Sequence, residues 1–169
     1  MPSNPDMGPI ETIAYIRNKH FEFCEVLRKH LHNVGGNNYP KCIVTLAAYN
    51  RAGVYYPSQE TCIYSLPYAM LNRDKYDWTI AHEACHHYQY ITFRPAKWHG
   101  DYWKYLLGSV CKQPFDTYHS YSVRQAKAMG KCLRMIPIAA DQLDNVTVIE
   151  NANEYHSSIR DKRSTRSTR

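Results

Sequence analysis

Residues 79–89 of the chain read TIAHEACHHYQ and contain the pattern His-Glu-x-x-His at positions 82–86. On a helix, residues four positions apart lie on the same face, so His82 and His86 can bind one metal ion together. Glu83 projects beside that face, where its carboxylate can take a proton from a metal-bound water. The stretch therefore predicts a helical metal site with the chemistry of a zinc hydrolase.

The residues around this motif predict two consecutive helices. The motif helix is expected to run from about residue 75 to residue 90, with Asp74 or Asp77 as its N-terminal cap. A second helix is expected to begin at residues 99–101 and to end before Pro114. Helical spacing gives each an apolar side, formed by Trp78, Ala81, Cys85 and Tyr88 in the first and by Trp103, Leu106, Leu107 and Val110 in the second.

A catalytic zinc site needs a third ligand, because such sites usually offer three protein ligands and leave one coordination position to water. A metzincin-like site would place a histidine at position 92, which is threonine. A thermolysin-like site would use a downstream glutamate, and the sequence has none between Glu83 and Glu150. Neither subclass fits the chain.

Four residues further along the chain remain as candidates for the third ligand: His99, His119, Asp101 and Asp116. We favour His99, because it opens the second helix after a loop long enough to turn the chain back towards the first. Gly100 beside it permits close packing at the metal. His87 lies one step off the face of His82, so we expect it to pack or hydrogen-bond nearby instead.

Before the motif, apolar residues at helical spacing predict a long first helix from Pro9 to just before Gly35-Gly36. Its three histidines are expected to be solvated or bonded locally: His20, His30 and His32.

Three β-rich segments follow at residues 41–47, 53–56 and 61–65, and their short links predict a small antiparallel sheet. After the two metal-site helices, another helix is predicted for residues 123–135. Residues 138–156 fit either a strand or a helix.

Length and composition are typical of a single globular domain, with 169 residues, 44% apolar and 21% charged. The sequence shows no apolar run of the roughly 20 residues that cross a bilayer and no signal peptide, so we expect no membrane partner and a cytoplasmic or other intracellular location. Its six cysteines include no Cys-x-x-Cys pair, which argues against a zinc ribbon or a thioredoxin-type site. We expect free, buried thiols.

The net charge of +6 is concentrated at the C-terminal end. Residues 160–169 hold five basic residues and one aspartate, which leaves +4 there and +2 on residues 1–159. Residues 157–169 cannot bury enough apolar area to fold and are predicted to form a disordered basic tail, suited to phosphate contacts. Aromatic residues near the motifs offer rings on which unpaired bases can stack: Trp98, Tyr102 and Trp103.

Two motifs, His82-Glu83-Ala84-Cys85-His86 and His99-Gly100-Asp101-Tyr102-Trp103, together resemble the SprT-like, Spartan-type family of zinc metalloproteases, over about residues 8–112. The resemblance implies an α+β, zincin-like domain in which a small antiparallel sheet packs with a long N-terminal helix and two metal-bearing helices. It also implies that one Zn²⁺ is bound by His82, His86 and His99, and that Glu83 is the catalytic acid/base.

On this basis, residues 1–156 are predicted to be one metalloprotease domain that hydrolyses peptide bonds, with a helical extension over residues 113–156. Members of this family are associated with DNA-dependent cleavage of proteins attached to DNA. DNA is therefore an expected partner beside the protein substrate, and a nucleoid or nuclear location would fit. The cysteine-rich zinc-binding segment of some relatives has no counterpart here.

Some features of the mechanism stay open in the sequence. The donor that stabilises the oxyanion is Tyr102, Tyr118 or His119, and Asp101 is a candidate for orienting a ligand imidazole. The alternative function is a catalytically silent, zinc-containing module that binds DNA or protein. A second alternative is a non-enzymatic helical interaction protein whose histidines bind no metal.

Overall fold

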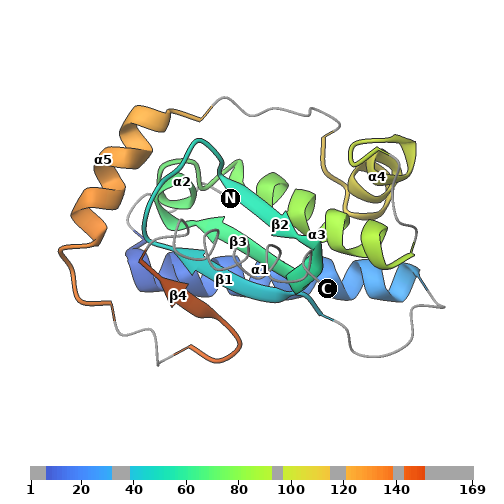
Figure 1. Cartoon of the computed structure of the whole chain (residues 1–169), viewed down its shortest axis with the longest axis horizontal. Coiled ribbons are helices and arrows are strands. Elements are labelled where there is room, and N and C mark those ends of the chain that lie inside the picture. Colours follow the sequence, from blue (N-terminus) through green and yellow to red (C-terminus); the bar gives the residue numbers. More distant parts are fainter. Residues whose placement is uncertain (1–6, 32–38, 93–96, 115–120, 139–142, 151–169) are drawn as a thin grey trace, which may run out of the picture.

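A computed structural model of the protein describes residues 7–31, 39–92, 97–114, 121–138 and 143–150. A long first helix is followed by three strands, then by a run of helices and by one last strand, which gives an α+β architecture (Figure 1). In order, the elements are α1 (Pro9–His30), β1 (Lys41–Thr45), β2 (Gly53–Tyr56), the 3-10 turn η1 (Pro57–Gln59), β3 (Thr61–Ser65), α2 (Leu66–Leu71), α3 (Tyr76–Thr92), α4 (Asp101–Tyr105), the π-helical turn η2 (Leu106–Val110), α5 (Val123–Leu133) and β4 (Thr147–Ile149).

The first helix starts where the sequence predicts and ends earlier. Pro9 occupies its first turn with Glu11, where a missing N–H costs nothing and a negative charge complements the helix dipole. Three basic residues fill its last turn, Arg28, Lys29 and His30. The expected stop at residues 35–36 lies outside the described residues.

The sheet is mixed, so the prediction of an antiparallel sheet is wrong. Its strand order is β2-β3-β1-β4, with β1 parallel to both β3 and β4 and only β2 antiparallel to β3. The three residues of η1 allow a hairpin between β2 and β3. Residues 46–52 instead carry the chain across the end of β3 to its far side, which leaves β1 and β3 as parallel neighbours.

Successive side chains along each strand point to opposite faces of the sheet, and the two faces here pack against different residues. Cys42 and Val44 of β1 join the main core, where α1 and α3 cover the sheet together in Figure 1. Ile43 and Ile63 point the other way and form a second, smaller cluster with partly buried neighbours, Tyr49, Val54, Tyr56 and Ile149. The main core thus lies between the sheet and the two longest helices.

His20 of α1 departs from the expectation of a solvated or locally bonded histidine. It is fully buried, with Nδ1 2.8 Å from the Tyr64 hydroxyl and Nε2 2.9 Å from the carbonyl oxygen of Pro40. Because a carbonyl only accepts, Nε2 carries the proton and Nδ1 accepts from Tyr64. Burial lowers the pKa of His20 to about 4. His30 is exposed and lies 2.9 Å from the Tyr105 hydroxyl, whereas His32 is outside the described residues.

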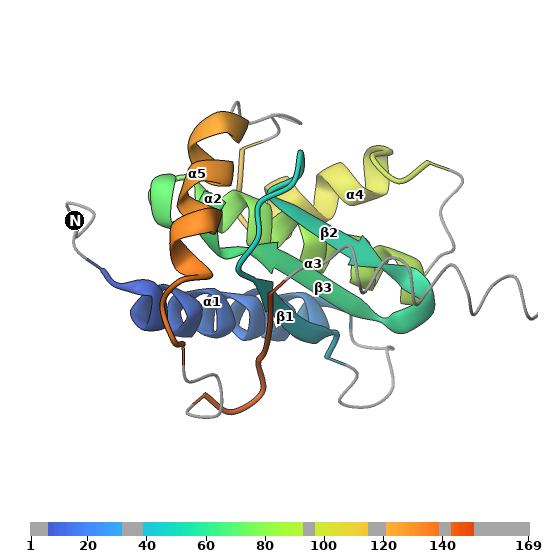
Figure 2. The same ribbon diagram turned by 60° about the vertical axis from the view of Figure 1, so that its left-hand side comes forward.

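The chain after α3 and α4 adds a helix, α5, and a strand, β4, to the fold. In Figure 1, α5 and α4 lie at opposite ends of the molecule, and Figure 2 shows α5 beside α2, with which it is in contact. A Cβ at Gly130 of α5 would lie 3.1 Å from the carbonyl oxygen of Leu46, so only glycine lets the helix approach this backbone so closely. Residues 147–149 form β4, which answers the open choice between strand and helix there and adds a strand to the expected helical extension.

All six cysteines are free thiols, as expected. Five of them are buried, whereas Cys132 of α5 is exposed. None of the described helices is both long and apolar enough to cross a membrane. The predicted tail, residues 157–169, lies outside the described residues.

Candidate metal centre

The His-Glu-x-x-His pattern lies on α3, which runs from Tyr76 to Thr92, close to the predicted helix. The predicted apolar side of this helix is buried in the core, with Trp78, Ala81, Cys85 and Tyr88 all buried. Asp77 is in the first turn of the helix. Packing of this side leaves the adjoining side of α3, with His82 and Glu83, on a cleft that Trp78 also lines.

Three histidines converge at this cleft. His82 Nε2 lies 3.0 Å from His86 Nε2 and 3.2 Å from His99 Nε2, and the candidate ligand atoms all lie within 4.8 Å of one another. Nitrogen ligands about 2.0–2.1 Å from a tetrahedral zinc ion would be roughly 3.3 Å apart. The spacing of the three nitrogens therefore fits one metal ion with a fourth position left open.

The third histidine is positioned by the start of α4. His99 directly precedes Gly100, the N-cap of this helix, and the Gly100 N–H donates to the carbonyl oxygen of Lys97 over 3.4 Å. The other candidate ligands do not join the cluster: Asp101 is exposed and outside it, whereas Asp116 and His119 lie outside the described residues.

Burial keeps these imidazoles neutral. Desolvation, with neighbouring histidines adding to it, lowers the pKa of His82 to about 2 and that of His86 to about 3. Partial burial also lowers the pKa of His99. Since a metal binds the neutral imidazole, these histidines are in the protonation state that can bind a metal ion at neutral pH.

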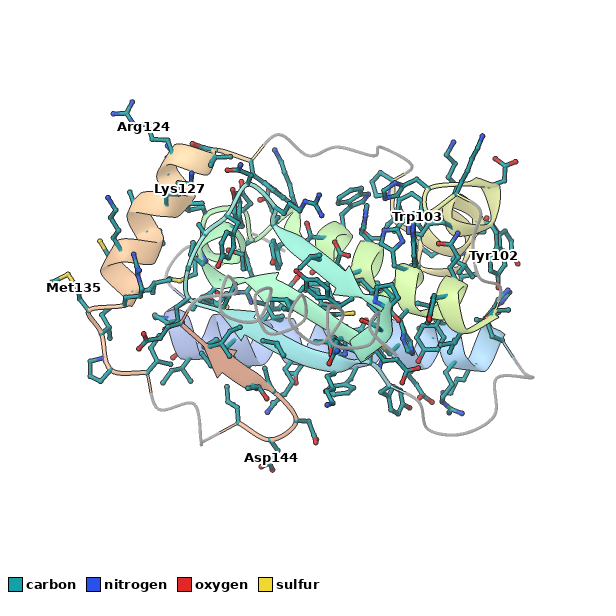
Figure 3. All side chains as sticks on the ribbon, in the orientation of Figure 1. Tyr102, Trp103, Arg124, Lys127, Met135 and Asp144 are labelled. Atoms are coloured by element: carbon teal, nitrogen blue, oxygen red, sulfur yellow. The ribbon has the colours of Figure 1, made fainter. Side chains whose placement is uncertain are left out.

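Trp103 holds the two helices of the site together. It is fully buried, its indole N–H donates to the carbonyl oxygen of His82 over 3.4 Å, and its ring centroid lies 4.7 Å from the ring centroids of His82 and His99. Figure 3 shows Trp103 between α4 and α3, and the neighbouring Tyr102 is partly buried against the same core. Trp103 is thus a core residue and cannot stack on a base, whereas Trp98 is 39% exposed at the cleft.

The far nitrogens of two candidate ligands lack partners. Nδ1 of His82 and Nδ1 of His86 are buried without a hydrogen bond among the described residues, and so is Oε1 of Gln89. The Gln89 side chain raises the pKa of His86 against the larger effect of burial, and its Nε2 donates to the carbonyl oxygen of Lys97 over 3.2 Å. Asp101, expected to orient an imidazole, has no hydrogen bond to any of them in the described part of the chain.

Glu83 lies deep in the cleft, with 7% of its surface exposed. Its side chain packs under β2, where a Cβ added to Gly53 would lie 3.1 Å from Glu83 Cγ and 3.3 Å from its Oε1. Desolvation raises the pKa of this carboxyl to about 8, and the positive charge of Arg51 opposes the rise. Glycine at position 53 therefore makes room for the carboxylate.

The cleft has a volume of about 920 Å³ and includes residues that the sequence pattern did not single out. They come from the loop after β1, from β2 and from the segment before α5: Asn50, Arg51, Gly53, Tyr55 and Tyr121. Only their place in the fold brings them there, although the aromatic segment around Tyr121 was visible in the sequence. His87 is buried and 2.9 Å from the Tyr55 hydroxyl, which confirms that it bonds nearby.

The sequence proposed three oxyanion donors, and the structure describes one of them. Tyr102 does not line the cleft, whereas Tyr118 and His119 lie outside the described residues. Tyr121 does line the cleft, with its hydroxyl 2.9 Å from Thr79 Oγ1 and 3.3 Å from the carbonyl oxygen of Lys75.

The sequence around the histidine cluster matches a known protein family. A model of the SprT-like family matches residues 23–132, about two thirds of the chain. The chain belongs to the SprT-like family. The matched segment of this SprT-like protein contains α3, α4 and the strands β1, β2 and β3. It also contains the three converging histidines and Glu83. No curated protein and no solved structure shows significant similarity to it.

Proposed function

We propose that the protein is a zinc-dependent metallopeptidase that hydrolyses peptide bonds. The observation that carries this proposal is the convergence of three neutral imidazoles beside the buried carboxyl of Glu83, in a chain of the SprT-like family. The donor set favours zinc, because imidazole nitrogens suit this ion and three of them leave a coordination position open. His82, His86 and His99 would hold it.

A bound zinc ion supplies a Lewis acid that polarises the scissile carbonyl and makes water a nucleophile near neutral pH. The chain supplies the proton transfers. Glu83 accepts a proton from the attacking water through a carboxylate oxygen and passes it to the nitrogen of the leaving amine. A nearby cation would lower the raised pKa of Glu83 and favour the carboxylate form that this role needs.

The edge of the sheet offers a place for an extended peptide. Among the described strands, β2 pairs with β3 alone, and Gly53, Val54 and Tyr55 of this edge strand line the cleft. A substrate chain can add to such an edge through main-chain hydrogen bonds, which would lay its peptide bonds along the histidine cluster. This arrangement favours a protein or peptide substrate over a small molecule.

The proposal is tested by zinc content and cleavage measured on the same preparations. The purified protein should contain one zinc per chain and cleave an unfolded protein such as casein. Glu83→Gln should keep the zinc and lose cleavage by a factor of about 10² to 10⁴, because the general base is missing. Equal cleavage by this variant would refute the role of Glu83, and zinc binding without any cleavage would favour a catalytically silent module.

Nucleic acid is part of the proposal as a partner, so that substrates would be proteins associated with DNA. The support comes from α5, where four exposed basic residues recur at helical spacing: Arg124, Lys127, Lys131 and Arg134. No acidic residue interrupts this helix, and Figure 3 shows Arg124 projecting away from the body of the protein. Such a row of cations fits a phosphate backbone.

A salt titration of DNA binding tests this partner. Replacing Arg124 and Lys127 together with glutamine should reduce the slope of log K against log salt by about 1.8, since each phosphate contact contributes roughly 0.9. The same double replacement at two exposed lysines outside α5, Lys41 and Lys104, is the control and should leave the slope unchanged. Equal slopes for the two double variants would exclude α5 as the DNA-binding surface.

A further inference from the structure

The cleft has two chemically different ends, and α3 sets the distance between them. At one end, Tyr68 is bonded to the carbonyl oxygen of Tyr49, next to Asn50 and Arg51, and its ring centroid lies 5.7 Å from that of Tyr121. At the other end, Trp98 stacks on Tyr90 with ring centroids 6.2 Å apart and planes inclined by 17°. The 15 residues from Tyr76 to Tyr90 span roughly 21 Å of helix. The histidine cluster lies between these two ends.

The loop at the first end is anchored on both sides of Arg51. The Tyr76 hydroxyl donates to the carbonyl oxygen of Ala52 over 2.6 Å, and the same carbonyl accepts from the Ser65 N–H over 3.0 Å. On the other side, the buried Tyr68 donates its hydroxyl proton to the carbonyl oxygen of Tyr49. These bonds fix the backbone from which the Arg51 side chain projects.

Arg51 is the cation of this cleft. Among the described lining residues, no lysine or second arginine accompanies it, and the sole carboxyl is the buried Glu83. Arg51 itself is exposed, and no ion pair joins it to a carboxylate in the described part of the chain. Two residues further along the chain, Gly53 lies against the Glu83 side chain, so Arg51 and this carboxyl line the same cleft.

A guanidinium in this position has a defined chemical preference. It stays charged at every physiological pH and presents a planar fork of N–H donors that matches the two oxygens of a carboxylate. The neighbouring Asn50, also exposed and lining the cleft, adds an amide donor. At the opposite end the cleft is lined by Trp98, which stacks on Tyr90, and no lysine or arginine is among the described residues that line this end. A substrate carboxylate is therefore favoured at one end only.

We infer that Arg51 forms a carboxylate subsite, which makes this protein selective for peptides that carry a carboxylate close to the scissile bond. This inference rests on the proposed peptidase function and goes further, because it names the substrate chemistry. The carboxylate has two sources in a peptide, an aspartate or glutamate side chain and the free C-terminus. A role of Arg51 limited to tuning Glu83 would instead affect all peptides equally.

The test compares matched peptides on the zinc-loaded full chain. One parent peptide carries glutamate, glutamine or lysine at each position flanking the cleavage site, and each version has a free or an amidated C-terminus. Wild-type protein should cleave the preferred carboxylate peptide with a kcat/KM about tenfold above its neutral counterpart, as expected for a charge-assisted hydrogen bond. The free-acid and amide pairs show which source supplies the carboxylate.

Variants of Arg51 then test whether this residue causes the preference for carboxylate peptides. Arg51→Gln should bring the ratio of carboxylate to neutral substrates to about one, and Arg51→Glu should reverse it in favour of lysine peptides. Lys104→Gln, which removes an exposed cation outside the cleft, should leave the ratio at its wild-type value. A wild-type ratio of one for both carboxylate sources, or a ratio that survives in Arg51→Gln, would overturn the inference.

Failure of the peptidase function has a different signature. In that case no peptide is cleaved in a Glu83-dependent manner, and the same peptides are compared by their Kd for the zinc-loaded protein. Tighter binding of carboxylate peptides that disappears in Arg51→Gln would support the subsite even then. Equal Kd values for carboxylate and neutral peptides would overturn it.

Discussion

Two groups of buried histidine nitrogens in this protein have opposite surroundings. His20, under the sheet, donates from one ring nitrogen to Pro40 and accepts at the other from Tyr64. The Nε2 atoms of His82, His86 and His99 instead face one another, and two of the far nitrogens lack a partner in the described chain. A lowered pKa is common to both groups, so it does not mark a functional site. What distinguishes the candidate metal centre is three Nε2 atoms that face one another instead of a donor or acceptor of the fold.

The largest expected effect concerns zinc and stability. Zinc at 1,000 times its Kd should raise the free energy of unfolding by about 4 kcal/mol, because it binds only the folded chain. This increment should vanish in His86→Ala and persist in His20→Gln. Urea denaturation with zinc and with a chelator measures it for each variant. An equal increment in His86→Ala would remove the distinction between the two histidine groups.

The second experiment measures the contribution of His20 to the pH dependence of the free energy of unfolding. Its folded pKa of about 4 lies below the ordinary 6.5, so the unfolded chain takes up a proton first as the pH falls. The resulting loss of stability begins near pH 6.5, is complete near pH 4 and amounts to about 3 kcal/mol, with full stability above pH 6.5. Unfolding by urea at pH 7 and pH 4.5, with a chelator present, should show less loss in His20→Gln. The exposed His30 provides the control, and a wild-type pH dependence is expected for His30→Gln.

The third test concerns the unpartnered nitrogen of His86. Gln89 sits between this imidazole and the Lys97 carbonyl, so its loss should disorder both His86 and the approach to His99. We expect Gln89→Leu to weaken zinc binding by about 10- to 100-fold, the usual cost of losing an outer contact of a metal ligand. Competition with a chromophoric chelator measures this, with the exposed Gln125→Leu as control. Unchanged affinity would mean that Gln89 does not support the site.

The smallest expected effect comes from crowding Glu83. A methyl group at position 53 would lie 3.0 Å from Thr79 Cγ2 and 3.1 Å from Glu83 Cγ, so Gly53→Ala should displace the carboxylate. We expect kcat to fall by about tenfold with zinc content intact, because small misplacements of a catalytic group are costly. Thr79→Ser removes the Cγ2 methyl and should restore part of the rate. A full rate in Gly53→Ala would show that the carboxylate tolerates the shift.

Sequence alone brought together the three histidines of the candidate metal centre, because the signals are local. Helical spacing brings His82 to His86, and the turn before α4 brings His99, without any knowledge of the remaining fold. The order and direction of the strands were harder to predict from the sequence, because a short link between two strands looks the same whether the chain forms a hairpin or crosses a third strand. Residues 46–52 cross β3, and this step both makes the sheet mixed and brings Arg51 to the cleft. His20 was missed for the same reason, since its partners come from distant parts of the chain.

The short strand β4 bears on how the protein can be shortened. The family match ends at residue 132, whereas the main-chain bonds that complete β1 come from residues 147–149. The Leu46 N–H also donates to the carbonyl oxygen of Ile149 over 2.9 Å. A chain trimmed to the matched segment would expose the backbone of β1, and an open strand edge recruits other strands. Such a fragment would keep the three histidines and Glu83 and still aggregate, so expression work should retain the chain through residue 150.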